Sequence, residues 1–243
     1  MKVAAFQAPL LPPGSTEALD LIRERVRWCE AAGVEILCCP EGVLGGLADY
    51  AHQPASIAID VASGQLDEIL APLASATVTT LLGFTELGRD GRLHNSAAVY
   101  HRGGVAGVYR KLHPAINRSV YTAGDATPVF TVGGLTFGII LCRDSVFPEP
   151  ARRMVEQGAG GLFIPTNNGL PRSKARADRV AEAAHEVDVA RATENGIWIV
   201  RADVAGEAGD HVSSGSTEIV APDGAVIASA LPFQADLIVA EIG

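Results

Sequence analysis

The 243-residue chain contains few cysteines, and their spacing is not that of a metal site or a disulfide scaffold. The four are Cys29, Cys38, Cys39 and Cys142, which include no C-x-x-C pair, and the six histidines do not fall at metal-ligand spacings. Structural zinc sites and disulfide frameworks both depend on closely patterned ligands. The sequence therefore predicts neither, and we expect no metal or organic cofactor.

Positive charge is also scarce. The chain has 19 basic residues against 28 acidic ones, which gives a formal net charge of −9 and a pI of about 5.1. Such a charge balance repels polyanions, so nucleic acid is not an expected partner. Hydrophobic residues make up 48% of the chain and charged residues 19%, which is typical of globular proteins and excludes disorder as the main theme.

The beginning of the chain lacks a long hydrophobic run. Residues 1–14, MKVAAFQAPLLPPG, contain one charge and an apolar stretch interrupted by Pro9, Pro12 and Pro13. This stretch has neither the length of a membrane span nor the layout of a signal peptide. We therefore expect a cytoplasmic protein that does not associate with membranes.

Apolar periodicity and turn residues predict alternating strands and helices, followed by hairpins with glycine-containing turns. Helices are predicted over residues 16–33, 65–76, 148–158 and 174–194. Strands or hairpins are predicted over residues 3–8, 34–40, 77–84, 95–111, 128–142, 161–165, 197–204 and 216–230. No linker or change of composition divides the chain, so we expect one α/β domain, residues 1–243, with helices packed on mixed sheets.

Three chemically different residues share one local context, because each follows the apolar run of a predicted strand. Glu41 follows residues 36–40, Lys111 follows residues 105–110, and Cys142 follows residues 137–141. Lys111 is one of only three lysines in the chain. Ligand sites of α/β sheets gather at the carboxyl ends of strands, so these three side chains are candidates for one site.

A thiol, a carboxylate and an ammonium group are together suited to acyl transfer through a thioester. The thiol attacks a carbonyl-like carbon, the carboxylate accepts the thiol proton, and the ammonium stabilises the oxyanion. The predicted helix start at Pro148 lies close behind Cys142 and is expected to favour the thiolate. Each residue also has an ordinary structural explanation: a buried cysteine is usually a small hydrophobe, and a strand-end glutamate or lysine is usually a surface charge.

Five segments resemble, in order, the signature segments of the nitrilase superfamily of carbon–nitrogen hydrolases. They are CCPEGVLGG, VYRKLHP, LCRDSVFPEPARR, ARATENGIWIV and GSTEIVAPDGAV, and together they extend over nearly the whole chain. The resemblance implies a four-layer α-β-β-α sandwich and a Glu-Lys-Cys triad made of Glu41, Lys111 and Cys142. It also implies a homodimer or a larger homo-oligomer.

The chain departs from the family pattern at two positions. Asn117 stands where many members have a second glutamate, and an amide cannot act as a base, although it can orient a substrate or form part of a turn. Val146 stands where members that take acidic substrates often have an arginine. This favours an uncharged acyl group, unless Arg143 or Arg172 supplies a cation from elsewhere.

The residues expected to contact substrate lie near the predicted nucleophile and at the end of the strand over residues 161–165. They are Asn117, Arg143, Ser145, Asn167 and Asn168. An Asn-Asn-Gly run is equally common as a simple turn, so both explanations stay open for Asn167 and Asn168.

The sequence thus predicts a hydrolase that converts a small carboxamide to an acid and ammonia. A nitrilase or an N-carbamoyl amide hydrolase with the same triad is the alternative within the family. The alternative that is not an enzyme is a catalytically inactive binding or scaffold protein with this fold. Asn117 supports this alternative, because it stands where many members have a second glutamate.

Overall fold

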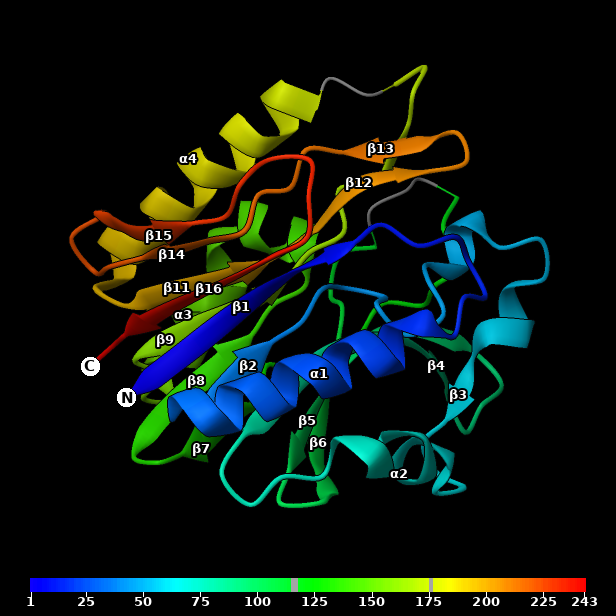
Figure 1. Cartoon of the computed structure of the whole chain (residues 1–243), viewed down its shortest axis with the longest axis horizontal. Helices are drawn as coiled ribbons and strands as arrows, with labels where there is room; N and C mark the ends of the chain where they lie inside the picture. Colours follow the sequence, from blue (N-terminus) through cyan, green and yellow to red (C-terminus); the bar gives the residue numbers. More distant parts are fainter. Residues whose placement is uncertain (115–117, 175–176) are drawn as a thin grey trace.

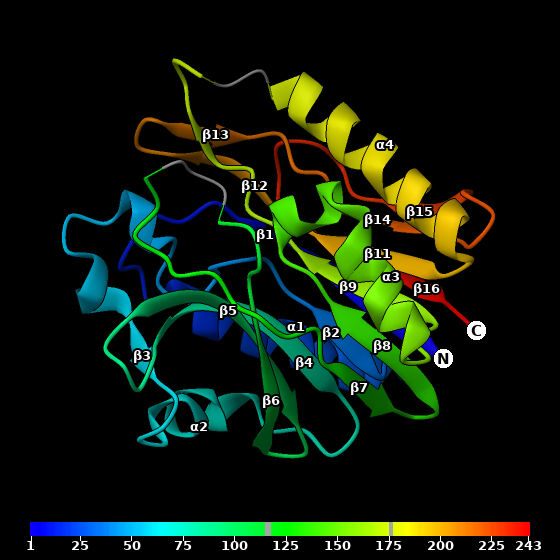
Figure 2. The same cartoon turned by 180° about the vertical axis from the view of Figure 1, so that it is seen from behind.

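Two β-sheets packed face to face form the centre of the molecule, and helices cover the outer face of each sheet (Figures 1 and 2). The computed structural model describes residues 1–114, 118–174 and 177–243, without the side chains of residues 177 and 178. The layers are those of the α-β-β-α sandwich, and the expected fold class is confirmed.

The first sheet has ten strands in the described residues and contains both chain ends. Its main path runs β10-β13-β12-β1-β2-β4-β5-β6, while β16 pairs with β1 and β3 pairs with β4. The strands are β1 (Lys2–Pro9), β2 (Ile36–Cys38), β3 (Ile59–Asp60), β4 (Thr79–Leu87), β5 (Leu93–His101), β6 (Gly104–Arg110), β10 (Leu170–Pro171), β12 (Val204–Ala208), β13 (His211–Ser213) and β16 (Asp236–Glu241). The helices α1 (Glu17–Ala32) and α2 (Gln65–Leu70) lie on its outer side (Figure 1).

The second sheet has six described strands in the order β15-β14-β11-β9-β8-β7. They are β7 (Val129–Val132), β8 (Leu135–Ile139), β9 (Gly161–Pro165), β11 (Trp198–Ala202), β14 (Glu218–Val220) and β15 (Val226–Ser229). The helices α3 (Pro148–Glu156) and α4 (Ala177–Asn195) cover this sheet (Figure 2). Short 3₁₀ turns complete the described structure: η1 (Ala48–Tyr50), η2 (Pro54–Ile57), η3 (Ala71–Leu73) and η4 (Cys142–Val146).

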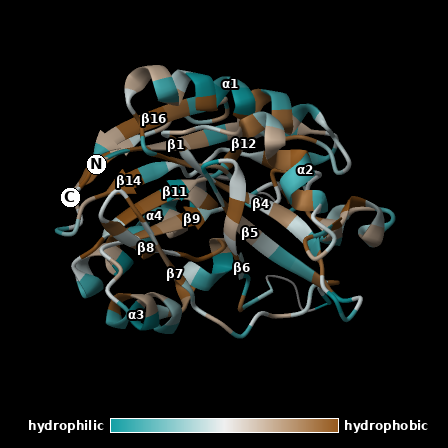
Figure 3. Cartoon of the chain, turned by 90° about the horizontal axis from the view of Figure 1, so that it is seen from below, coloured by the Kyte–Doolittle hydropathy of each residue, from teal (hydrophilic) through white to brown (hydrophobic). Residues whose placement is uncertain are grey.

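Alternation along the strands of the first sheet explains how one sheet is buried on both faces. Val3 and Ala5 of β1 belong to the core between the two sheets, whereas Ala4 and Phe6 belong to the core beneath α1 and α2. Successive strand residues point to opposite faces, so a strand buried on both sides is apolar throughout. Figure 3 shows hydrophobic colours on the central strands and hydrophilic colours on much of α1 and α3 at the two sides of the molecule.

The hairpin predictions are confirmed, since β5–β6, β7–β8 and β14–β15 are each joined at the expected glycine turn. Two other predictions were wrong in detail. The helix expected over residues 65–76 ends at Leu70 and continues only as η3, which contains Pro72, because proline disrupts an α-helix. The single strand expected over residues 197–204 is divided between β11 and β12, which lie in different sheets on either side of Asp203.

Within the part of the chain that the structure describes, no helix has the length and apolar character needed to cross a membrane.

Candidate active site

Glu41 lies in a turn just beyond β2, held against strands of both sheets. Its backbone N–H donates to Thr166 O at the end of β9 (3.2 Å), and Gly83 N of β4 donates to Pro40 O (3.0 Å). A Cβ atom at Gly83 would lie 2.6 Å from Glu41 Cα, so only glycine allows the turn to approach β4 this closely. The backbone of Glu41 is therefore fixed where the two sheets meet.

The Glu41 carboxylate is buried and accepts three hydrogen bonds. Lys111 Nζ donates to Oε1 at 2.5 Å, Asn95 Nδ2 donates to the same oxygen at 2.8 Å, and the backbone N–H of Asn167 donates to Oε2 at 3.1 Å. The side chains of Lys111 and Glu41 are only 3% and 2% exposed. A buried ion pair is costly to desolvate and contributes little net stability, so stability alone does not explain why this pair is buried.

Lys111 directly follows β6 and remains in register with the neighbouring chain segments. Its N–H donates to Asn95 O, and its carbonyl accepts from Gly124 N, both at 2.8 Å. Burial alone would lower the pKa of Lys111, but the Glu41 carboxylate and the Cys142 sulfur raise it above its usual value. The ammonium group is therefore charged at neutral pH and fixed in position.

Cys142 begins η4 at the end of β8 and has a left-handed backbone with φ of 41°. This conformation is uncommon for a residue with a side chain and costs roughly 1–3 kcal/mol, so the surrounding contacts must hold it. Ser145 provides one of them, because its hydroxyl donates to Cys142 O at 2.7 Å. Cys142 is partly exposed, whereas Cys29, Cys38 and Cys39 are buried.

Burial raises the pKa of the Cys142 thiol to about 12, and the Glu41 carboxylate raises it further while Lys111 and Arg201 oppose the shift. This direction is opposite to the one expected from the helix start at Pro148. The reason is that desolvation of the thiol, together with the charge of Glu41, outweighs the cations around it. The resting sulfur is therefore a thiol, and a base must take its proton.

Asn168 faces the sulfur and is held by a buried carboxylate. The Cys142 thiol lies 3.8 Å from Asn168 Oδ1 as a hydrogen-bond donor. Asp203 accepts from Asn168 N at 3.0 Å and from Asn168 Nδ2 at 2.9 Å, and the Ser216 hydroxyl donates to Asp203 at 2.7 Å. Burial raises the pKa of Asp203 against these hydrogen bonds. The network fixes the amide oxygen of Asn168 toward the thiol.

A second buried hydrogen-bond network, centred on Arg201, contacts η4 through Ser145. Arg201 Nε and Nη2 donate to the Asp188 carboxylate, Arg201 Nη1 donates to the Thr166 hydroxyl at 2.7 Å, and Nη2 also donates to the Ser145 hydroxyl at 3.1 Å. The Arg201 and Asp188 side chains are 2% and 0% exposed. This network links the Cys142 turn to β9 and α4.

The structure brings Glu41, Lys111, Asn167 and Asn168 together with Cys142, as the sequence predicted for their positions. Ser145 is buried and its hydroxyl is occupied by backbone and Arg201 contacts, which favours a supporting position over direct substrate contact.

The two remaining residues predicted to contact substrate are Arg143 and Asn117. Arg143 is exposed, with its guanidinium 5.9 Å from the centre of the Phe147 ring. Asn117 lies outside the described residues.

Several residues at the site were missed from the sequence. They are Asn95, Asp203, Ser216, Arg201 and Asp188. The sequence contains a weak indication of Asn95, Arg201 and Asp203, because these polar residues lie within otherwise apolar runs. Across the described residues, no cluster of three or more histidine, cysteine, aspartate or glutamate side chains is arranged to hold a metal ion.

Comparison with known proteins identifies the family. The carbon–nitrogen hydrolase family model matches residues 2–243. A protein described as "Hydrolase in pqqF 5'region" from Pseudomonas protegens is 30% identical over 235 residues, covering 95% of this chain and 79% of the relative. An (R)-stereoselective amidase from a Pseudomonas species is 29% identical over 200 residues, covering 81% of this chain and 69% of that protein.

Solved structures show the same fold. An amidase from Nesterenkonia superposes with a TM-score of 0.80 at 24% identity, covering 100% of this chain and 90% of the amidase. A glutamine-dependent NAD⁺ synthetase from Acinetobacter baumannii gives a TM-score of 0.83 at 18% identity, although this chain spans only 44% of it. The family match and the fold together establish that the chain belongs to the carbon–nitrogen hydrolase family of the nitrilase superfamily.

Proposed function

We propose that this carbon–nitrogen hydrolase is an amidase that converts a small, uncharged carboxamide to its acid and ammonia through a thioester on Cys142. The observation that carries the proposal is the buried Glu41–Lys111 pair, whose charges both act on the one partly exposed thiol of the chain. Glu41, Lys111 and Cys142 are the proposed catalytic residues.

The first half of the reaction forms the thioester. Glu41 accepts the thiol proton as the sulfur attacks the amide carbon, since the raised pKa of Cys142 keeps the thiol protonated until then. Lys111 and backbone N–H groups at Cys142 and Arg143 stabilise the oxyanion. The carbon–nitrogen bond breaks as Glu41 returns the proton to the leaving nitrogen, so ammonia departs and a neutral thioester remains.

The second half consumes one water molecule. Glu41, again a carboxylate, takes a proton from water, whose oxygen attacks the thioester carbon. The carbon–sulfur bond breaks, the sulfur recovers its proton from Glu41, and the acid is released. Asn168, whose amide is fixed by Asp203, orients the protonated thiol before the attack by accepting its hydrogen bond.

Ammonia release over a panel of substrates tests the proposal. The panel contains short amides, ω-amides with a free carboxylate, N-carbamoyl amino acids and nitriles. We expect the highest kcat/KM for neutral amides. Faster turnover of nitriles would favour the nitrilase alternative, and no turnover of any compound would favour the binding or scaffold alternative.

We also propose that residues 1–243 act as one catalytic domain and that this domain self-associates. The site uses residues from Glu41 to Ser216, and both chain ends pair in the same sheet through β1 and β16, so the proposed domain extends over the whole range. Val146, next to the Cys142 turn, is 56% exposed, which provides apolar surface for an interface. Light scattering after size exclusion measures the mass, and a monomer at working concentration would contradict self-association.

A further inference from the structure

A mainly apolar cavity of about 290 Å³ lies beside the site. Its wall comes from the loop after β1, the segment after β2, the segment after β9 and the β12–β13 hairpin, and includes Leu10, Tyr50, Asn167, Ala208, Asp210 and His211. Building on the proposed function, we propose that this cavity binds the acyl chain of the substrate, which is an amide with a neutral, apolar chain of about four to six carbons.

Two lining residues connect the cavity to the reacting groups. The backbone N–H of Asn167 donates to Glu41 Oε2, and its side-chain amide donates to Glu41 O at 3.3 Å. Tyr50 lies close enough that Glu41 and Cys142 contribute, after burial and Asp49, to raising the pKa of its hydroxyl. The ring of Tyr50 packs edge-on against His211 at 4.8 Å, so its position is fixed from the cavity side. An acyl group extending from Cys142 past these residues enters the cavity.

The size of the cavity exceeds what the smallest amides need. One water molecule takes about 30 Å³ in the liquid, so 290 Å³ is far more than the methyl group of acetamide fills. Apolar area removed from water is the main source of affinity in such a pocket. A longer apolar chain that fills the cavity is therefore favoured over a short one.

The charge around the cavity excludes an acidic chain. Among the described residues that line the cavity, Asp210 is the single acidic one and none is a lysine or an arginine, and Asp210 is exposed. Arg172, one of the two cations that the sequence offered for an acidic substrate, forms an ion pair with Glu207. A carboxylate at the end of the substrate chain would meet the Asp210 carboxylate with no lysine or arginine of the described lining beside it, which costs binding energy.

A chain-length series tests the inference on the full-length protein. We would measure kcat/KM for acetamide, butyramide and hexanamide, and for the monoamide of adipic acid, which has the length of hexanamide with a terminal carboxylate. One methylene in an apolar pocket changes kcat/KM by about 10- to 200-fold at most. We expect hexanamide to exceed acetamide by at least tenfold and to exceed the adipic monoamide by a similar factor.

Two variants and a matched control locate the effect. Ala208→Phe fills the cavity from a partly exposed hairpin position, and we expect it to lower the hexanamide-to-acetamide ratio of kcat/KM at least tenfold. Ala106→Phe makes the same change at an exposed position of β6, away from the cavity, and should leave the ratio unchanged. Asp210→Asn should raise kcat/KM for the adipic monoamide about two- to threefold, because a rim charge is partly screened.

The outcomes separate the inference from the function on which it rests. Hydrolysis of acetamide with no gain along the series, or a ratio that Ala208→Phe leaves unchanged, overturns the acyl-chain assignment alone. Failure of the wild-type protein to hydrolyse any of the amides overturns the proposed function together with the inference. If Ala208→Phe does not fold, the wild-type series still decides, because a preference for acetamide contradicts the assignment.

Discussion

Arg110 and Lys111 are neighbours at the end of β6, and each forms an ion pair with a glutamate on an opposite face of the first sheet. Lys111 pairs with Glu41 on the face toward the second sheet, and Arg110 pairs with Glu86 on the helix-covered face. The Lys111 and Arg110 side chains are 3% and 43% exposed. At the same edge of the sheet, the Lys111–Glu41 pair is therefore buried, whereas Arg110 of the other pair is exposed to water.

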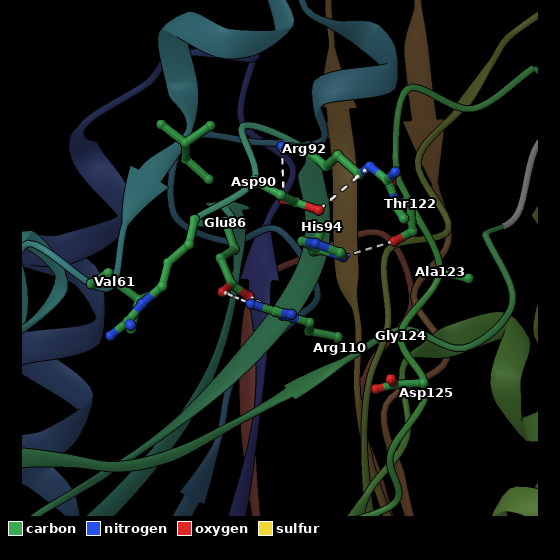
Figure 4. A pocket seen from close by; sticks show the side chains of 13 residues that line it. Val61, Glu86, Asp90, Arg92, His94, Arg110, Thr122, Ala123, Gly124 and Asp125 are labelled. Carbon is green, nitrogen blue, oxygen red and sulfur yellow. Dashed lines mark hydrogen bonds and ion pairs between the residues drawn. The ribbon is translucent and has the colours of Figure 1, made fainter.

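The Arg110 pair lies in a roomy polar cavity of about 650 Å³ (Figure 4). Figure 4 shows three contacts among its polar groups: Arg110 donates to Glu86, Arg92 pairs with Asp90, and His94 Nδ1 donates to Thr122 O, whereas no contact is drawn to Asp125. Most of the charged side chains that line this cavity, Arg110, Glu86, Arg92 and Asp90, are therefore already paired with one another. Its size alone is therefore a poor guide to function.

The Lys111 pair differs because a reactive group lies beside it. The Cys142 sulfur raises the pKa of Lys111, and the Lys111 ammonium opposes the rise in the pKa of Cys142. Low local polarity strengthens these interactions, and it would strengthen stabilisation of an oxyanion in the same way. Burial together with an adjacent nucleophile is what separates a candidate catalytic pair from a structural one.

The largest expected effect comes from removing the thiol. We expect Cys142→Ala to reduce kcat for amide hydrolysis by about 10⁴-fold or more, because no other group replaces a covalent nucleophile. Ammonia release and thermal unfolding of the purified variant check the loss and the fold. Cys29→Ala, which removes a buried thiol from the α1 side of the molecule, is the matched control and should keep its activity.

Exchanging the two cations tests the difference between the Lys111–Glu41 and Arg110–Glu86 pairs directly. Lys111→Arg keeps the charge but changes the position of the donors, so kcat should fall by about 10²- to 10³-fold. Arg110→Lys makes the reverse change on the other face and should alter kcat by less than about threefold, a rough allowance for a partly exposed pair. Equal losses in the two variants would show that Lys111 acts only as a structural charge.

Asp203→Asn tests the support of Asn168. The change removes one acceptor of the Asn168 amide and should lower kcat by about 10- to 100-fold through misplacement of the thiol. Because the folded pKa of Asp203 is raised, its ionisation opposes folding as the pH rises above the unfolded value of about 3.9. Denaturant unfolding at pH 4 and pH 8 should therefore show the variant gaining stability relative to wild type at the higher pH.

The smallest effect concerns the stability supplied by the Arg110 pair. Burial would raise the pKa of Glu86, but hydrogen bonds from Arg110 and Ser96 lower it below its usual value. A lowered acid pKa means that the contribution is present above the unfolded value of about 4.3 and is lost as the pH falls through the folded value. Arg110→Met should cost roughly 1 kcal/mol at pH 7. In urea unfolding, a difference from wild type that grows below pH 4 would contradict this assignment.

Local patterns predicted the hairpins and the position of Glu41, Lys111 and Cys142 just beyond strands. Glycine turns mark strand ends, and a charged residue directly after an apolar run marks the edge of a sheet, as at Glu41 and Lys111. These features depend on neighbours in the sequence, so a single sequence contains them. The glycine at position 83, which lets the Glu41 turn approach β4, has no local signature of this kind.

The supporting contacts could not be predicted because they join distant segments. Asn168 and Asp203 are 35 residues apart, and Glu41 and Asn167 are 126 residues apart. The switch of the chain between sheets at Asp203 likewise depends on which strands are already paired, and not on the apolar pattern of residues 197–204. The pKa of Cys142 is raised because distant segments bury the thiol. The helix start at Pro148 had led us to expect a thiolate instead.

The most direct test of the account is to trap the acyl-enzyme. The wild-type protein is mixed with hexanamide, quenched in acid within one turnover, and digested for mass spectrometry. The account predicts a hexanoyl group on the peptide that contains Cys142, absent from Cys142→Ala and unaffected in Cys29→Ala. Steady hydrolysis with no acyl adduct at Cys142, or with an adduct on another residue, would contradict the proposal that Cys142 is the nucleophile beside the buried Glu41–Lys111 pair.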